Sequence, residues 1–229
     1  MKADLFVPCG GRPKSIHAAN WKSLLDADGK PIFKWIVEGA NLFLTQDARI
    51  KLEEKGVLVF KDSSTNKGGV TSSSLEVLAG LALDDKTFER EMVSTGKDPE
   101  FRKKYICEIL ELIRSKADAE FEILWSLHEQ TGRTISELSD VLSEKINEIT
   151  SAIDASDLFG DKKLRVSVLL SHIPASLVGI VGIESLLAHI PLSYQNAIFA
   201  RALASGFVYR HGIDAGYEEY RRYITDCQG

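Results

Sequence analysis

The residues best suited to chemistry in this 229-residue chain lie between Asn66 and Ser74, a stretch with two adjacent glycines and three consecutive serines. The apolar run Val57–Phe60 precedes it and the helix-forming run Leu75–Leu83 follows it. The sequence therefore predicts a strand, a glycine-bearing loop and a helix. Adjacent glycines let the backbone approach a ligand closely. Serines at a helix N-terminus, with its unpaired N–H groups and positive dipole end, can receive an anion, here a carboxylate rather than a phosphate. The alternative is a solvated turn with a serine cap.

Two earlier stretches repeat this arrangement of a strand followed by a glycine-bearing loop. Asp4–Pro8 reads as a short buried strand and leads into Cys9–Gly11, while Phe33–Glu38 reads as a strand and leads into Gly39–Asn41. In an open α/β sheet, ligands bind at the carboxyl ends of the strands. We therefore expect the three loops to converge on one edge of a sheet. The alternative for Cys9 is a small packed residue in a tight turn.

The elements that position these loops alternate between strand and helix. A helix is predicted over Asp47–Lys55, with Gly56 as its stop, and a short helix near Asn20–Leu25. Three such alternations within residues 1–83 predict a parallel sheet with crossover helices. No Gly-x-Gly-x-x-Gly motif occurs in the chain. The half of a dinucleotide fold that carries this motif is expected upstream, in a longer polypeptide.

Beyond Leu83 the pattern becomes helical. Asp98-Pro99 is typical of a helix start, and apolar residues at helical spacing continue from Phe101 to Trp125. Thr134–Glu137 has the pattern of a capping box. Four further helices are predicted over Leu164–Ile173, Leu177–Ile190, Tyr194–Tyr209 and Tyr217–Ile224. We expect two domains, an α/β domain over residues 1–83 and an all-α domain over residues 84–229.

The amino-acid composition of the chain bears on the classes of partner that it can bind. The net charge of -5 argues against nucleic acid and anionic membranes as partners. The longest apolar run, within Leu177–Ile190, is too short to span a bilayer. Three widely separated cysteines indicate free thiols in a reducing compartment. The five histidines have no metal-ligand spacing, so no metal site is expected.

Taken together, the three loops resemble the amino-acid dehydrogenase family. More narrowly, they are similar to large-subunit NAD-dependent glutamate dehydrogenases of fungi and protists. The matching segments are Asp4–Gly11, Ile36–Asn41 and Asn66–Glu76, supported in the helical tail by Leu138–Ser143 and Phe207–Tyr209. The resemblance covers essentially the whole chain. It implies that residues 1–83 form the second half of a Rossmann-like NAD-binding domain.

The resemblance also implies an activity and the roles of individual residues. The family oxidatively deaminates L-glutamate to 2-oxoglutarate and ammonium, with NAD as the hydride acceptor. By position, Cys9 and Gly10 lie beside the nicotinamide, and Asn41 and Asn66 lie near the cofactor. By the same correspondence, two residues of the third loop contact the substrate. These are Val70 and Ser73, with the Ser73 hydroxyl binding a substrate carboxylate.

The family's catalytic lysine and aspartate have no counterpart in this chain, and Lys14, Lys22 and Asp26 match no catalytic position. We therefore expect no catalytic residue here, a fragment that is inactive in isolation, and the acid–base residues upstream. The resemblance implies an intracellular homo-oligomer, in the mitochondrial matrix or the cytoplasm. Two alternatives remain: a dehydrogenase that uses another amino acid or NADP, and a non-catalytic regulatory or assembly module.

Overall fold

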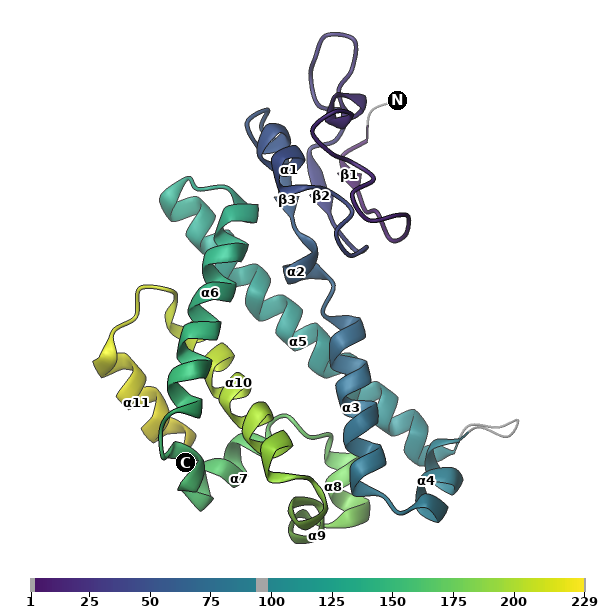
Figure 1. The fold of residues 1–229 in the computed structure, drawn as a ribbon, viewed down its shortest axis with the longest axis vertical. Coiled ribbons are helices and arrows are strands. Elements are labelled where there is room, and N and C mark those ends of the chain that lie inside the picture. The colour runs from purple at the N-terminus through teal and green to yellow at the C-terminus, as the bar shows by residue number, and fades with distance from the viewer. Residues whose placement is uncertain (1–2, 94–98, 229) are drawn as a thin grey trace. The chain divides into compact units, whose positions relative to one another are not determined.

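The structure, a computed structural model, describes residues 3–93 and 99–228. The chain forms two compact units. Unit 1 comprises Met1–Lys67 and Ala117–Ser143, and unit 2 comprises Gly68–Lys116 and Glu144–Gly229. The elements are labelled in chain order in Figure 1. The two long helices, α5 (Glu100–Thr131) and α6 (Ile135–Asp154), contribute residues to both units.

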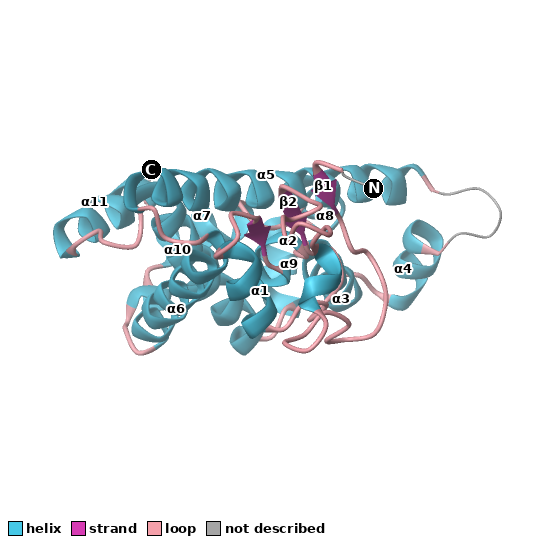
Figure 2. Ribbon diagram, turned by 90° about the horizontal axis from the view of Figure 1, so that it is seen from above, coloured by secondary structure: helices cyan, strands magenta, loops and turns pink. Residues whose placement is uncertain are grey.

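Unit 1 is built on a parallel three-stranded sheet, drawn in magenta in Figure 2. The strand order β1-β2-β3 follows the chain. Its elements are β1 (Leu5–Phe6), the 3-10 helix η1 (Trp21–Leu24), β2 (Trp35–Val37), α1 (Gln46–Glu53), β3 (Leu58–Phe60) and α2 (Asp62–Thr65). The predicted fold class is confirmed: a small parallel sheet with a crossover helix precedes a helical region.

The two faces of the sheet are packed differently, because successive side chains of a strand point to opposite faces. One face carries Ile36 and Val59, both 0% exposed, which belong to the same buried core as Ala48 and Leu52 of α1. The expectation that β1 is a buried strand was wrong. Leu5 is 51% exposed, since β1 lies at the edge of the sheet in the described chain.

Within unit 1, the start of α6 is held by an acidic residue from α1. The Glu53 carboxylate accepts hydrogen bonds from the Ser136 amide at 3.0 Å and the Ser136 hydroxyl at 2.6 Å. A negative group at this position satisfies helix N–H groups and complements the helix dipole. The helix begins where the capping-box pattern predicted, but Glu137 pairs with Arg133 at 2.8 Å instead of capping the helix.

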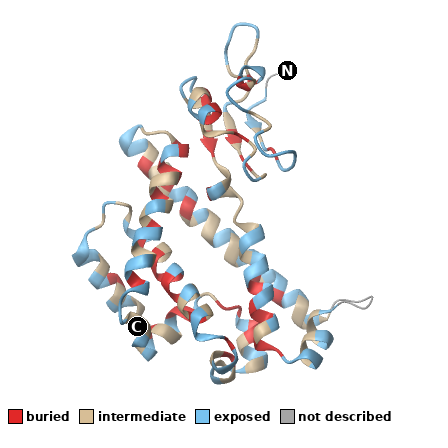
Figure 3. Cartoon of the chain, viewed as in Figure 1, coloured by how far each residue is buried: buried red, intermediate tan, exposed pale blue. Residues whose placement is uncertain are grey.

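Unit 2 is entirely helical in the residues described. Besides its parts of α5 and α6, it contains α3 (Gly68–Ala82), α4 (Asp85–Met92), the 3-10 helix η2 (Leu158–Gly160), α7 (Lys162–Leu170), α8 (Ala175–Val181), α9 (Ile183–His189), α10 (Leu192–His211) and α11 (Tyr217–Cys227). Buried residues, drawn in red in Figure 3, run along α10. They include Phe199 and Phe207, at 0% and 1% exposure.

Three details of unit 2 differ from the sequence prediction. The helix expected at Leu75 begins seven residues earlier, at Gly68. The single helix expected over Leu177–Ile190 is broken at Gly182, whose φ of 79° lies in the left-handed region. Helix α4 was not predicted; Asp84 caps it by accepting from the Thr87 amide. The helix start predicted at Asp98 lies outside the described residues.

Candidate functional site

The loops that follow the three strands of unit 1 meet at the carboxyl edge of the sheet. After β1, the Pro8 carbonyl accepts a hydrogen bond from the Ala40 amide, in the loop after β2, at 2.7 Å. A Cβ added to Gly39 would lie 3.1 Å from the Cys9 sulfur. Glycine at this position therefore allows the first two loops to pack closely. Cys9 is a free and exposed thiol, and a Cβ at Gly10 would meet nothing within 4 Å.

The second and third loops are joined by a contact between two predicted site residues. The Asn66 side-chain amide donates a hydrogen bond to the Asn41 side-chain oxygen at 2.6 Å. The Thr65 hydroxyl, one residue before Asn66, donates to the Glu38 carbonyl at 2.6 Å and joins the same two segments of the chain. Of the three predicted loops, the first two and the first residue of the third, Asn66, therefore meet at this edge within unit 1. This arrangement brings Cys9 and Gly10 to the same edge as the two asparagines.

A buried ion network that sequence reasoning missed lies beneath this edge. The Arg49 guanidinium, 5% exposed, contacts the Glu38 carboxylate at 2.7 Å and the Asp62 carboxylate at 3.2 Å. The second Glu38 oxygen accepts from the Leu44 amide at 2.9 Å, and Asp62 accepts from the Leu42 amide at 2.7 Å. These bonds hold both ends of the segment Leu42–Leu44, which directly follows Asn41.

The backbone at Leu42 shows that this segment is tightly constrained. Leu42 has a φ of 55°, an uncommon conformation for a residue with a side chain. Its carbonyl accepts from the Lys14 amide at 2.6 Å, so Leu42 is held on one side by the first loop and on the other by Asp62. We conclude that the ion network sets the path of the loop that carries Asn41.

The other two predicted site residues, Val70 and Ser73, lie on α3 in unit 2. The expected glycine-bearing loop was wrong at this point, because Gly68 and Gly69 form the first turn of the helix. Ser73 therefore lies beyond the first turn, and its hydroxyl donates to the Val70 carbonyl at 3.2 Å. Both residues are on the exposed side of the helix, with Val70 72% exposed.

The side of α3 that faces away from Val70 and Ser73 is buried in the C-terminal half of the helix. Leu75, Leu78, Ala79 and Ala82 are all buried. Their spacing of three and four residues forms one apolar stripe. The two glycines lie in the first turn of the helix, ahead of this stripe, where no residue is buried. The serines donate back to carbonyls of the preceding turn, which is a usual arrangement for serine inside a helix.

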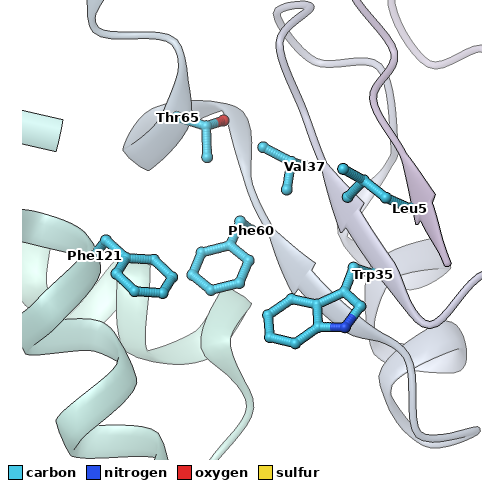
Figure 4. Close-up of a pocket in the computed structure, with 6 residues that line it drawn as sticks. All are labelled: Leu5, Trp35, Val37, Phe60, Thr65 and Phe121. Atoms are coloured by element: carbon cyan, nitrogen blue, oxygen red, sulfur yellow. The ribbon is translucent and has the colours of Figure 1, made fainter. Parts of the chain in front are cut away.

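Unit 1 also has an apolar hollow of about 400 Å³ on the sheet face opposite α1. Figure 4 shows Phe121 from α5 beside Phe60, and Phe60 beside Trp35. The ring centroids are 5.4 Å apart for Phe121–Phe60 and 6.1 Å apart for Trp35–Phe60. The hollow is lined by Leu5, Trp35, Val37, Phe60, Thr65 and Phe121. It lies on a sheet face rather than at the strand ends, and no predicted site residue lines it.

Metal ions and membranes concern two further features of the described residues. Across residues 3–93 and 99–228, no three His, Cys, Asp or Glu side chains are grouped so that they could hold a metal ion. In the same residues, no single helix is long and apolar enough to cross a membrane. The helix pair α7 and α8, bent by 118°, meets the criterion of length and composition when taken together. All three cysteines are free, as expected.

Comparison with known proteins assigns the chain to a family. The family described as Glutamate/Leucine/Phenylalanine/Valine dehydrogenase matches residues 1–132. "Glutamate dehydrogenase 2" of Dictyostelium discoideum is 47% identical over 97% of this chain and 21% of its own length. "NAD-specific glutamate dehydrogenase" of Neurospora crassa is 49% identical over 99% of this chain and 22% of its own length.

A third relative, the "NAD-specific glutamate dehydrogenase" of Saccharomyces cerevisiae, is 44% identical over 96% of this chain and 21% of its own length. The chain thus spans about a fifth of the length of these curated relatives. No solved structure matches it. The family match covers all three strands, the loops that follow them and the helices α3, α4 and α5. The chain therefore belongs to the Glutamate/Leucine/Phenylalanine/Valine dehydrogenase family.

Proposed function

We propose that the full-length protein that carries this chain catalyses the NAD-dependent oxidative deamination of L-glutamate to 2-oxoglutarate and ammonium. The observation that carries the proposal is the contact between Asn41 and Asn66. It joins two strand-end loops at the edge of a parallel sheet where α/β proteins bind their ligands. Relatives that are 44–49% identical are named glutamate dehydrogenases, and several of them are named NAD-specific.

The chemistry of the loop residues fits a nicotinamide cofactor. The asparagine side chains offer amide donors and carbonyl acceptors, the groups that pair with ribose hydroxyls and a carboxamide. Space at Gly10 leaves the backbone accessible. We therefore assign cofactor contacts to Cys9, Gly10, Asn41 and Asn66. When bound, NAD supplies the hydride acceptor; the residues of this chain orient it.

The substrate contacts are assigned to α3. Ser73 is exposed, and its hydroxyl now donates to a carbonyl of its own helix. A hydroxyl rotates freely, so it can donate instead to a carboxylate oxygen, which makes a stronger acceptor. Val70, one turn earlier and 72% exposed, offers apolar surface to the aliphatic part of glutamate. The acid–base groups are proposed to lie outside this chain, which is then inactive alone.

The organisation of the full-length protein is proposed in the same way. Residues 1–83 are assigned to the second half of the NAD-binding domain and residues 84–229 to a helical domain. Apolar residues exposed on α5, Ile106 and Leu110 at 39% and 57%, are consistent with a homo-oligomer. Three free cysteines are consistent with a reducing compartment, the mitochondrial matrix or the cytoplasm.

An activity assay of the full-length protein tests the proposal. We expect NADH to form only when both L-glutamate and NAD are present. Little reduction should occur when NADP replaces NAD or leucine replaces glutamate. Equal or faster turnover with NADP or leucine would assign the protein to another branch of the family. An inactive full-length protein would overturn the proposal, whereas an inactive isolated chain is the expected result.

A further inference from the structure

The helical region of unit 2 contacts the proposed substrate helix through two tyrosine hydroxyls. Tyr105 of α5 donates a hydrogen bond to the Leu75 carbonyl at 2.6 Å, and Tyr194 of α10 donates to the Ser74 carbonyl at 2.9 Å. The two acceptors are consecutive residues of α3. A carbonyl oxygen has two lone pairs, so each can accept a tyrosine hydroxyl as well as its helical N–H partner.

These two bonds fix the rotation of α3 about its axis. The tyrosine hydroxyls meet the backbone directly after Ser73. The side chains that face the unit 2 core are Leu75, Leu78 and Ala79, at 8%, 1% and 0% exposure. Val70, Ser73 and Val77 lie on the opposite side of the helix. If α3 rotated, Ser73 would turn toward the core and the two hydrogen bonds would break.

The two tyrosines are themselves firmly held. Tyr105 is 1% exposed and stacks on Phe101, with ring centroids 5.6 Å apart. Burial raises the pKa of the Tyr105 hydroxyl, which keeps it protonated as a donor. One turn further along α5, Glu108 accepts from the amide and hydroxyl of Ser176, at 3.0 and 2.6 Å, at the start of α8.

Tyr194 is fixed by its neighbour. Gln195, 2% exposed, donates to the carbonyls of Leu187 and Ile190 at 2.7 and 2.8 Å. This pair of bonds ties the first turn of α10 to the end of α9, and α9 packs on α3. The buried side chain of Gln195 therefore holds the start of α10, and with it Tyr194, next to α3. Both Tyr194 and Gln195 lie beyond the residues matched by the family.

We infer that Tyr105 and Tyr194 are positioning residues for substrate binding, which hold α3 in the rotation that presents Ser73 and Val70 to glutamate. The inference rests on the proposed function and extends it. It gives the helical region of unit 2 a role in recognising the amino acid, through the backbone of α3. Neither tyrosine touches the substrate in this account.

Kinetics of the full-length protein with Tyr194→Phe test the inference, since this change removes only the hydroxyl. A neutral hydrogen bond contributes about 0.5–1.5 kcal/mol, so we expect the glutamate KM to rise about 2- to 10-fold. The NAD KM and the melting temperature should stay close to wild type. Tyr217→Phe is the matched control, because Tyr217 is 72% exposed on α11 of the same unit. Tyr105→Phe should act in the same direction.

A double variant separates positioning from general weakening of the fold. If Tyr194 acts through Ser73, its effect on the glutamate KM should largely vanish when Ser73 is already alanine. The inference is overturned if the Tyr194→Phe effect persists in full in that background, if the NAD KM rises equally, or if the glutamate KM does not change. A wild-type protein without glutamate-dependent NADH formation would overturn the proposed function, and this inference with it.

Discussion

The Asn66 side-chain amide donates a hydrogen bond to the Asn41 side-chain oxygen at 2.6 Å, across 25 residues of sequence. The two residues follow different strands of one parallel sheet. Each asparagine keeps further hydrogen-bonding groups, because a primary amide has two donors and two acceptor lone pairs. The pair can therefore hold two loops together and still contact a ligand.

A double-mutant cycle tests whether this pair acts as a unit. Asn41→Ala and Asn66→Ala should each raise the NAD KM of the full-length protein, because each removes a cofactor contact and the support of the other side chain. The double variant should then cost less than the sum of the two, with a coupling of about 0.5–3 kcal/mol. Strictly additive effects would show that the two asparagines act independently.

Ser73→Ala tests the assignment of the substrate contact. Losing a hydrogen bond to a charged group costs about 1.5–3 kcal/mol, so the glutamate KM should rise at least 10-fold while the NAD KM changes little. Ser72→Ala is the matched control, since Ser72 is also exposed and also donates to a carbonyl of α3. An unchanged glutamate KM in Ser73→Ala would remove this residue from the site.

Arg49→Met tests the buried network under the loops. The change leaves the Glu38 and Asp62 carboxylates without their cation, in a place where Glu38 is 0% exposed. Breaking a buried pair in this way should lower the free energy of unfolding by about 3–5 kcal/mol, measured by urea denaturation. Lys34→Met, which removes an exposed pair with Asp4, is the control and should leave stability unchanged. Equal effects of the two variants would contradict the structural role of Arg49.

His172 predicts a pH dependence of stability. Its burial, followed by the positive charge of Lys116, lowers the pKa of the imidazole from 6.5 to about 4. Between these values the unfolded chain binds a proton that the folded chain does not, so stability falls as the pH drops from 6.5 to 4. The loss is at most about 3 kcal/mol. His172→Gln should flatten this part of the profile in denaturation experiments; an identical slope would contradict the shift.

The sequence predicted the sheet and the meeting of its loops because both follow from general rules. Parallel strands joined by crossovers place all their carboxyl ends at one edge. Glycine after each of the first two strands marked where their loops lie, and these two loops do meet, through Pro8 with Ala40 and Cys9 with Gly39. The start of α3 was missed because two adjacent glycines read locally as a loop, whereas Gly68 and Gly69 form the first turn of the helix.

The contacts that support the strand-end loops and α3 could not be predicted from the sequence. Glu38, Arg49 and Asp62 are separated by 11 and 13 residues, and no local pattern relates an acid after a strand to an arginine inside a helix. The hydrogen bonds of the Tyr105 and Tyr194 hydroxyls could not be predicted either, because an apolar helix face has the same sequence pattern whether or not its tyrosines reach a backbone carbonyl. Such contacts depend on tertiary packing alone.

The central claim, that the strand-end loops of unit 1 bind the cofactor, is tested most directly by the reactivity of Cys9. Both Cys9 and Cys107 are free and exposed, and they lie in different units. Alkylation of each thiol in the full-length protein can be followed by mass spectrometry with and without NAD. We predict that saturating NAD slows the labelling of Cys9 several-fold and leaves Cys107 unchanged. Equal labelling of Cys9 with and without NAD would contradict the claim.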